Sequence, residues 1–184
     1  MFYPLEVAGV KRELPLFPVS DSLSIAAFIL LGDQELTVAC ARDLLAKAPA
    51  YDYLLTAEAK SISLIHEMAR QAGDEKYFVA RKGIKVYMKD PLDVEVKSIT
   101  TAKVQHLYLS SEEAEQMKGK RILIIDDVIP TGKSLEALET LVREAGGVVC
   151  GRMAVLAEGD AIERDDITVL APLPLFSADG QPIA

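Results

Sequence analysis

The stretch from Arg121 to Ser134 reads RILIIDDVIPTGKS, and it decides the fold. Its first half holds four consecutive Ile or Leu residues between charged ones, which is typical of a strand covered on both faces of a sheet. Two carboxylates, Asp126 and Asp127, follow at the carboxyl end of that strand. A turn containing Gly132 leads into a helical pattern, so the stretch predicts a central strand, a tight turn and a helix in succession.

Apolar runs and helical patterns alternate on both sides of this stretch from about residue 50 onward. The alternation favours an α/β fold with a central, mainly parallel sheet flanked by helices. Before residue 50, three prolines within the first 18 residues predict an irregular flap, and a helical pattern follows it. We expect strands over 53–56, 77–80, 104–109, 148–156 and 167–170, and helices over 34–48, 62–72, 135–142 and from a capping box at Ser110 and Glu113.

Length and composition limit the class of protein. The 184 residues suit a single domain, and 20 basic against 28 acidic side chains give a net charge of −8. This excess of negative charge argues against nucleic acid or acidic membranes as partners. The longest apolar run, 25–31, is too short to cross a bilayer, and no signal peptide pattern opens the chain, so we expect a cytoplasmic location. Cys40 and Cys150 stand apart from any zinc-binding pattern, which predicts two buried thiols.

The turn after the two carboxylates has the chemistry of a phosphate site. Residues 131–134 present successive backbone N–H groups at the positive end of a helix, and Gly132 allows close approach of the backbone to a ligand. Asp126 and Asp127 lie where open α/β sheets bind ligands, with a spacing that suits two vicinal hydroxyls. A sugar phosphate would satisfy both halves of the stretch.

The same stretch is open to two other interpretations. The letters TGKS end like a Walker A loop, but that motif needs glycine at position 127, where Asp127 stands and would repel phosphate. The alternative without function is a plain strand, turn and helix with a polar cap. The combination over 124–134 is much more specific than two adjacent aspartates alone, and it favours a binding site.

Residues 124–134 resemble the phosphoribosyl pyrophosphate signature of the type I phosphoribosyltransferases. That signature has four apolar, two acidic and two apolar residues, then a small residue, Thr-Gly and two more small residues. This chain departs from it at Pro130 and at Lys133. The resemblance implies that Asp126 and Asp127 hold the ribose 2- and 3-hydroxyls. It implies a 5-phosphate site formed by Pro130, Thr131, Gly132, Lys133 and Ser134.

Two further segments fit this resemblance. Residues 57–61 are similar to the family's pyrophosphate-binding loop, and residues 76–89 contain five basic side chains and no acidic one. Residues 86–101 fit the family's mobile loop, which closes over the site. We assign no catalytic residue, because the acidic residues in this loop have no secure match. The resemblance implies a diphosphate site formed by Ala59, Lys60, Ser61, Arg81, Lys82 and Lys85.

The choice of base follows from the resemblance to adenine phosphoribosyltransferases. Residues 9–12 look like their hood segment, in which the backbone at Val10 would read the purine edge and Arg12 would approach the ring and the diphosphate. Leu156 and Glu158 would stand beside the base. Transferases that act on 6-oxopurines often offer a lysine in this neighbourhood, and none occurs between 148 and 184, which favours adenine.

The resemblance therefore implies one phosphoribosyltransferase domain over 1–184, with a hood formed mainly by 1–20 and part of the C-terminal segment. It would join adenine to phosphoribosyl pyrophosphate and release AMP and diphosphate. Mg²⁺ would be the cofactor, held mainly by the ligand and water rather than by protein side chains, and the assembly would be a homodimer. The alternatives are a xanthine/guanine or orotate phosphoribosyltransferase, or a non-catalytic regulator that senses phosphoribosyl pyrophosphate.

Overall fold

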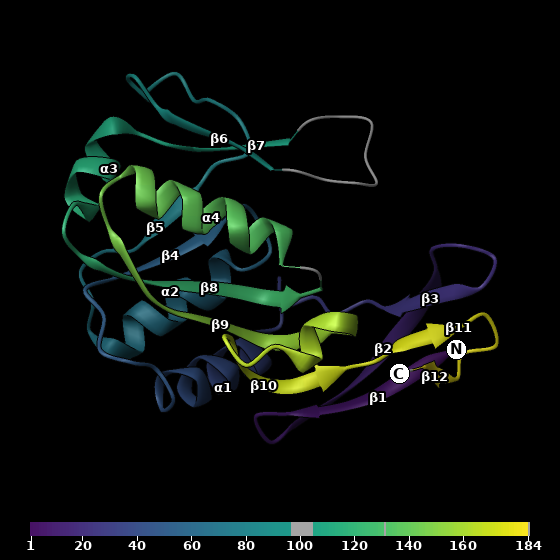
Figure 1. The fold of residues 1–184 in the computed structure, drawn as a ribbon. Coiled ribbons are helices and arrows are strands. Elements are labelled where there is room, and N and C mark those ends of the chain that lie inside the picture. The colour runs from purple at the N-terminus through teal and green to yellow at the C-terminus, as the bar shows by residue number, and fades with distance from the viewer. Residues whose placement is uncertain (97–104, 131, 184) are drawn as a thin grey trace.

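The computed structural model describes residues 1–96, 105–130 and 132–183. Its centre is a sheet of five parallel strands in the order β10-β9-β8-β4-β5, with β8 in the middle (Figure 1). This confirms the predicted fold class and the central position of the strand that begins at Arg121. The bounds are β4 (Tyr53–Ala57), β5 (Phe78–Ala80), β8 (Arg121–Ile129), β9 (Val148–Glu158) and β10 (Thr168–Leu173).

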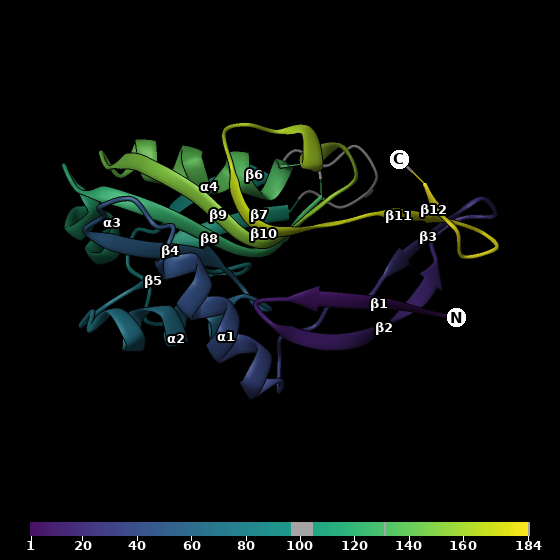
Figure 2. The same ribbon diagram turned by 90° about the horizontal axis from the view of Figure 1, so that it is seen from below.

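Helices cover both faces of this sheet, as a run of apolar residues in a central strand requires. Alternate residues of β8 point to opposite sides: Leu123 joins one buried cluster and Ile124 the other. Helices α1 and α2 lie on the first side, and α4 lies on the second (Figure 2). The helices are α1 (Gln34–Leu45), α2 (Ile62–Ala72), α3 (Ser111–Met117) and α4 (Lys133–Glu144), with a short 3₁₀ helix η1 (Gly159–Glu163) after β9.

The ends of these helices follow local sequence signals. Ser110 and Glu113 form the predicted capping box, in which each side chain bonds the other residue's backbone N–H. Gly73 ends α2 in the left-handed conformation that glycine adopts at low cost. No helix of the described residues is both long and apolar enough to cross a membrane.

The N-terminal residues form strands, so the prediction of an irregular flap is wrong. A second, mainly antiparallel sheet runs in the order β1-β2-β3-β11-β12 and brings both termini together (Figure 1). Ala8 and Gly9 both have positive φ, which makes the two-residue turn of a hairpin. Pro4 is accommodated because its strand lies at the sheet edge. The strands are β1 (Phe2–Val7), β2 (Val10–Pro18), β3 (Leu23–Ala26), β11 (Leu175–Ser177) and β12 (Pro182–Ile183).

A separate hairpin occupies part of the segment expected to form a loop. Strand β6 (Leu92–Val96) pairs antiparallel with β7 (Gln105–Leu109), and Val94 is buried beneath it. The residues 92–96 are therefore strand rather than loop. The expected loop also included 97–101, which lie outside the described residues.

Candidate active site

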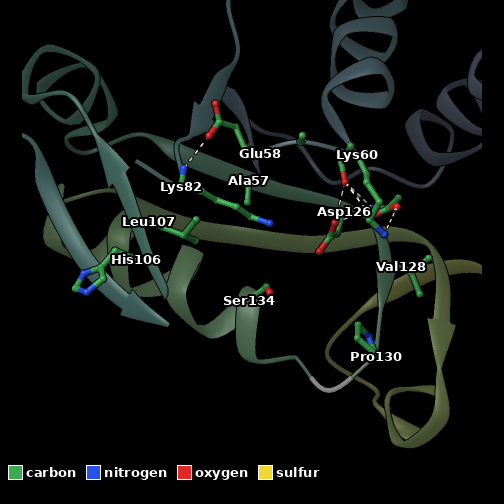
Figure 3. Close-up of a pocket in the computed structure, with 13 residues that line it drawn as sticks. Ala57, Glu58, Lys60, Lys82, His106, Leu107, Asp126, Val128, Pro130 and Ser134 are labelled. Atoms are coloured by element: carbon green, nitrogen blue, oxygen red, sulfur yellow. Dashed lines mark hydrogen bonds and ion pairs between the residues drawn. The ribbon is translucent and has the colours of Figure 1, made fainter. Parts of the chain in front are cut away.

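A cavity of about 220 Å³ opens at the carboxyl end of the central sheet (Figure 3). Four segments far apart in the sequence converge on it: the turn after β4, the residues after β5, strand β7, and the stretch from the end of β8 to the start of α4. Ligands of open α/β sheets bind at this edge, where the strands deliver their last residues. The lining residues are Ala57, Glu58, Ala59, Lys60, Ser61, Lys82, His106, Leu107, Asp126, Asp127, Val128, Pro130 and Ser134.

The two carboxylates predicted from the sequence lie in this cavity and are held by the turn after β4. The Ser61 hydroxyl donates to Oδ1 of Asp126 at 2.8 Å and accepts from the backbone N–H of Asp127 at 2.9 Å. Lys60 Nζ lies 2.8 Å from Oδ2 of Asp127. The structure therefore joins Lys60 and Ser61 to the aspartates across more than sixty residues of sequence.

The electrostatics of this pair are unbalanced. Burial, reinforced by the adjacent Asp127, raises the pKa of Asp126 well above the ordinary range of a carboxyl group. Asp127 itself is almost fully buried, and Lys60 is the one cation that contacts it among the described residues. Two close carboxylates with one ion-pair partner are costly to keep ionised unless further donors arrive. Hydroxyl groups of a ligand would supply such donors.

The turn between β8 and α4 is where the phosphate-binding residues were predicted. Pro130 and Ser134 line the cavity, and Lys133 is the first residue of α4. Gly132 has a φ of +78°, a left-handed conformation that side chains disfavour. Thr131 lies outside the described residues. The described part of the turn therefore brings a helix N-terminus to the same cavity as the two carboxylates.

The basic segment predicted to hold diphosphate is only partly at the cavity. Lys82 lines it together with Ala59, but Arg81 and Lys85 are directed to Glu58. Arg81 Nη1 donates to Oε1 of Glu58 at 2.9 Å, the Lys82 N–H donates to Oε2 at 2.8 Å, and Lys85 Nζ lies 4.0 Å from Oε1. Burial works to raise the pKa of Glu58, yet these donors and cations outweigh it and lower that pKa.

Three of the four residues predicted to contact the base do not line this cavity. Val10 lies on β2 and does not line the cavity. Arg12 forms ion pairs with Asp33 at 2.6 Å and with Glu35 at 2.8 Å. Leu156 is fully buried in the core, because β9 is covered on both faces.

The fourth predicted base contact stands near the site. Glu158 ends β9, and burial raises its pKa while the charge of Lys60 opposes that rise. Because Lys60 also contacts Asp127, Glu158 shares an electrostatic partner with the carboxylate pair.

Several lining residues were missed by sequence reasoning. Glu58 was read only as part of a loop, although an acidic residue opposite a basic run is a usable signal. No local pattern marks His106, whose Nδ1 lies 2.6 Å from Oδ1 of Asp93 on the neighbouring strand β6. Only the register of the β6–β7 hairpin brings these two together. Val128 follows the aspartates directly and also lines the cavity.

The donor set is compatible with Mg²⁺, which prefers oxygen ligands and retains water. Asp126 and Asp127 offer carboxylate oxygens to the cavity. Across the described ranges, no group of three or more His, Cys, Asp or Glu side chains converges in a way that could enclose a metal ion. An ion here would therefore complete its coordination with oxygens of a bound phosphate compound and water.

Comparisons with known proteins give relatives of one kind. An adenine phosphoribosyltransferase from Corynebacterium jeikeium is 37% identical over 73 residues, which cover 40% of this chain and 34% of that protein. A hypoxanthine/guanine phosphoribosyltransferase from Methanohalophilus mahii is 26% identical over 61% of this chain and 55% of its own length. The matches thus span about a third to just over half of these curated relatives.

Solved structures extend the likeness over most of the fold. Adenine phosphoribosyltransferase from Thermoanaerobacter pseudethanolicus matches with a TM-score of 0.68 and 19% identity, covering 86% of this chain and 95% of that one. The Saccharomyces cerevisiae enzyme, solved with an iminoaltritol bisphosphate and adenine, also gives a TM-score of 0.68, with 16% identity over 86% of this chain and 92% of that one. The family model described as the phosphoribosyl transferase domain matches residues 32–171. With the signature at the end of β8 and this match over most of its length, the chain belongs to the phosphoribosyl transferase domain family.

Proposed function

We propose that the chain is a purine phosphoribosyltransferase that joins adenine to phosphoribosyl pyrophosphate, giving AMP and diphosphate. The observation that carries the proposal is the adjacent pair of half-buried Asp126 and buried Asp127, which shares one cavity with a helix N-terminus and has one contacting lysine for two carboxylates among the described residues. A phosphorylated ribose matches these features: its diol supplies donors to the carboxylates, and its phosphate accepts from the turn.

The ribose would be held by hydrogen bonds that its hydroxyl groups donate to the two carboxylates. Oδ2 of Asp127 contacts Lys60 without the alignment of a hydrogen bond, so it retains the capacity to accept one. Asp126 is partly exposed to the cavity and accepts from Ser61. Hydroxyl donors from the ribose would stabilise the charged forms of both groups, which burial alone disfavours.

The diphosphate would be met by the cations around the turn after β4. Lys60 and Lys82 already line the cavity, and Glu58 holds Arg81 and Lys85 beside it. In the reaction, the bond from the anomeric carbon to the diphosphate breaks, and a ring nitrogen of the base forms the new bond and loses its proton. These cations would stabilise the negative charge that develops on the leaving diphosphate. Mg²⁺, when bound with the diphosphate, would neutralise part of the same charge.

The base would lie between the end of β9 and the cavity wall. Val128 is in register with Leu156 of β9 and offers the cavity the apolar surface that buried Leu156 does not. Glu158 could accept a hydrogen bond from an exocyclic amine, a group that adenine has. The relatives bear adenine, hypoxanthine/guanine and xanthine in their names. The choice of adenine as the substrate therefore depends on this chemistry and on the absence of lysine after residue 148.

The proposal includes several properties of the whole molecule. The second sheet would act as the hood over the base. The segment 86–101, of which residues 92–96 form strand β6, would shield the site from water. The chain would work in the cytoplasm as a homodimer, without nucleic acid or membrane partners. Its excess of negative charge favours a local rather than a general attraction for anions.

Diphosphate release from phosphoribosyl pyrophosphate tests the function directly. The assay uses Mg²⁺ and a panel of adenine, guanine, hypoxanthine, xanthine and orotate. We expect adenine to give the highest kcat/KM. A preference for another base by more than about tenfold, equivalent to ~1.4 kcal/mol, contradicts adenine but not the phosphoribosyl site. Binding of phosphoribosyl pyrophosphate without release for any base would instead support the regulator.

A further inference from the structure

Arg164 directly follows η1 and packs against Gly132 in the turn between β8 and α4, although it lies outside the signature sequence. A Cβ atom at position 132 would overlap Nη1 of Arg164. The guanidinium therefore occupies the space that a side chain at position 132 would need. Figure 1 shows the short helix η1, in yellow-green, next to the end of β8, the strand that leads into this turn.

The orientation of this guanidinium is fixed by a neighbouring carboxylate. Arg164 donates from Nε to Oδ1 of Asp166 at 2.8 Å and from Nη2 to Oδ2 at 2.7 Å. This two-point pairing uses one edge of the guanidinium and leaves Nη1 on the side of Gly132. Within the described ranges, Nη1 forms no hydrogen bond to another residue, and the side chain is 28% exposed.

The same ion-pair network returns to the helix that starts at the turn. Asp166 also lies 3.9 Å from Nε of Arg152 on β9, and Arg152 donates to Oε1 of Glu139 on α4. Arg164 is thus linked through two charged partners to the body of α4, while it touches the residue that precedes the same helix. Such a network holds a long side chain in place before any ligand arrives, which lowers the entropy lost on binding.

We propose that Arg164 belongs to the 5-phosphate site, as a positioning residue that keeps the Gly132 turn in the shape that receives a phosphoryl group and as a fixed cation beside it. This inference rests on the proposed function, because it presupposes that the turn binds a phosphate. It assigns a role to a residue about thirty positions after the signature. It also gives a second reason for glycine at 132: a larger residue would displace the guanidinium as well as strain the backbone.

Calorimetric binding of two separate ligands tests the role of Arg164. Ribose 5-phosphate probes the turn, and diphosphate with Mg²⁺ probes the cations after β4. The variants are Arg164→Gln and Arg164→Lys. The matched control is Arg143→Gln, because Arg143 is an exposed arginine in the last turn of α4, the helix that starts at the Gly132 turn. We expect Arg164→Gln to weaken ribose 5-phosphate at least tenfold, and Arg164→Lys to recover part of that loss. Arg143→Gln should bind both ligands normally.

The comparison of ligands separates this role from a general structural one. Binding of diphosphate should stay within about twofold in Arg164→Gln. Ribose 5-phosphate binding that also stays within twofold would overturn the inference, as would an equal loss of both ligands in both Arg164 variants. If the unaltered chain binds phosphoribosyl pyrophosphate but Arg164→Gln binds ribose 5-phosphate with undiminished affinity, only this inference fails. If the unaltered chain binds neither ribose 5-phosphate nor phosphoribosyl pyrophosphate, the proposed function fails with it.

Discussion

The central strand β8 carries charged residues at both of its ends, and the two ends are built in opposite ways. At the amino end, Asp52 accepts from the backbone N–H of Arg121 at 2.7 Å and from its guanidinium at 3.0 and 3.2 Å. These bonds lower the pKa of Asp52 to about 2. At the carboxyl end, Asp126 and Asp127 are adjacent, Lys60 contacts Asp127 alone, and the pKa of Asp126 is raised.

The difference separates a structural pair from a binding site. Asp52 and Arg121 satisfy each other, so nothing more is needed to keep both charged. The aspartates at the other end are under-compensated, and a fold that keeps such a pair has a free-energy deficit that a ligand can relieve. The same strand therefore contributes stability at one end and retains binding capacity at the other. Four changes would break or sharpen this contrast.

The largest effect is expected from replacing both site carboxylates. Asp126→Asn with Asp127→Asn should lower kcat/KM for diphosphate release about a hundredfold to ten-thousandfold, because two hydrogen bonds to charged groups are lost, each worth about 1.5–3 kcal/mol. The matched control is Asp52→Asn, the same chemical change at the other end of β8, which should retain most activity. Near-normal turnover in the double variant would refute the ribose assignment.

A smaller effect is expected at Lys60. Lys60→Gln should weaken diphosphate with Mg²⁺ about tenfold to a hundredfold, since one charge-assisted contact is removed. It should also lower Tm, because buried Asp127 loses its ion-pair partner. Lys118→Gln is the control, as Lys118 is exposed and forms only a loose pair with Glu115. Unchanged diphosphate affinity in Lys60→Gln, measured by calorimetry, would remove Lys60 from the site.

The pH dependence of stability should reveal the raised pKa of Asp126. Asp126 holds its proton more tightly in the folded state than in the unfolded chain. Above about pH 4 the unfolded chain ionises this carboxyl group first, so the free energy of unfolding falls as pH rises. Asp126→Asn removes that loss, so its Tm should exceed that of the unaltered chain increasingly toward neutral pH. A gain of about 1 kcal/mol would correspond to about 2–4 °C. Calorimetric melts between pH 4 and pH 8 measure it, and a Tm below that of the unaltered chain throughout would argue against under-compensation.

The smallest effect, with the opposite sign, belongs to Asp52. Its pKa is lower in the fold than in the unfolded chain, so its stabilisation is complete above about pH 4 and is lost as pH falls toward 2. Asp52→Asn should therefore lower Tm at neutral pH, and the difference from the unaltered chain should shrink in acid. A difference that persists at pH 2 would show that the loss comes from packing rather than from charge.

Much of the carboxyl end of β8 could be predicted from the sequence, because its signals are local. A run of apolar residues between charges, two aspartates and a glycine turn follow one another within fourteen positions. The capping box of α3 is also local, and the structure has it as predicted. Residues adjacent in the chain need no knowledge of the tertiary fold to be read together.

The features that local signals do not predict all depend on partners distant in the sequence. Arg12, predicted to approach the base, pairs in the structure with Asp33, the N-cap of α1, and with Glu35 in the first turn of that helix. Leu156, predicted to lie beside the base, is buried because its strand is covered on both faces. The hairpin over residues 2–18 was missed because its Ala8–Gly9 turn lacks the Asn-Gly or Asp-Gly pair that usually marks such turns.

One thermal-shift experiment tests the contrast between the two ends most directly. The melting of the unaltered chain, of Asp52→Asn and of the double variant with Asn at 126 and 127 is measured with and without phosphoribosyl pyrophosphate and Mg²⁺. A ligand that binds only the folded state raises Tm, and at a fixed ligand concentration the shift grows with the logarithm of the affinity. The account predicts equal upward shifts for the unaltered chain and Asp52→Asn, and none for the double variant. A full shift in the double variant, or its loss in Asp52→Asn alone, would contradict it.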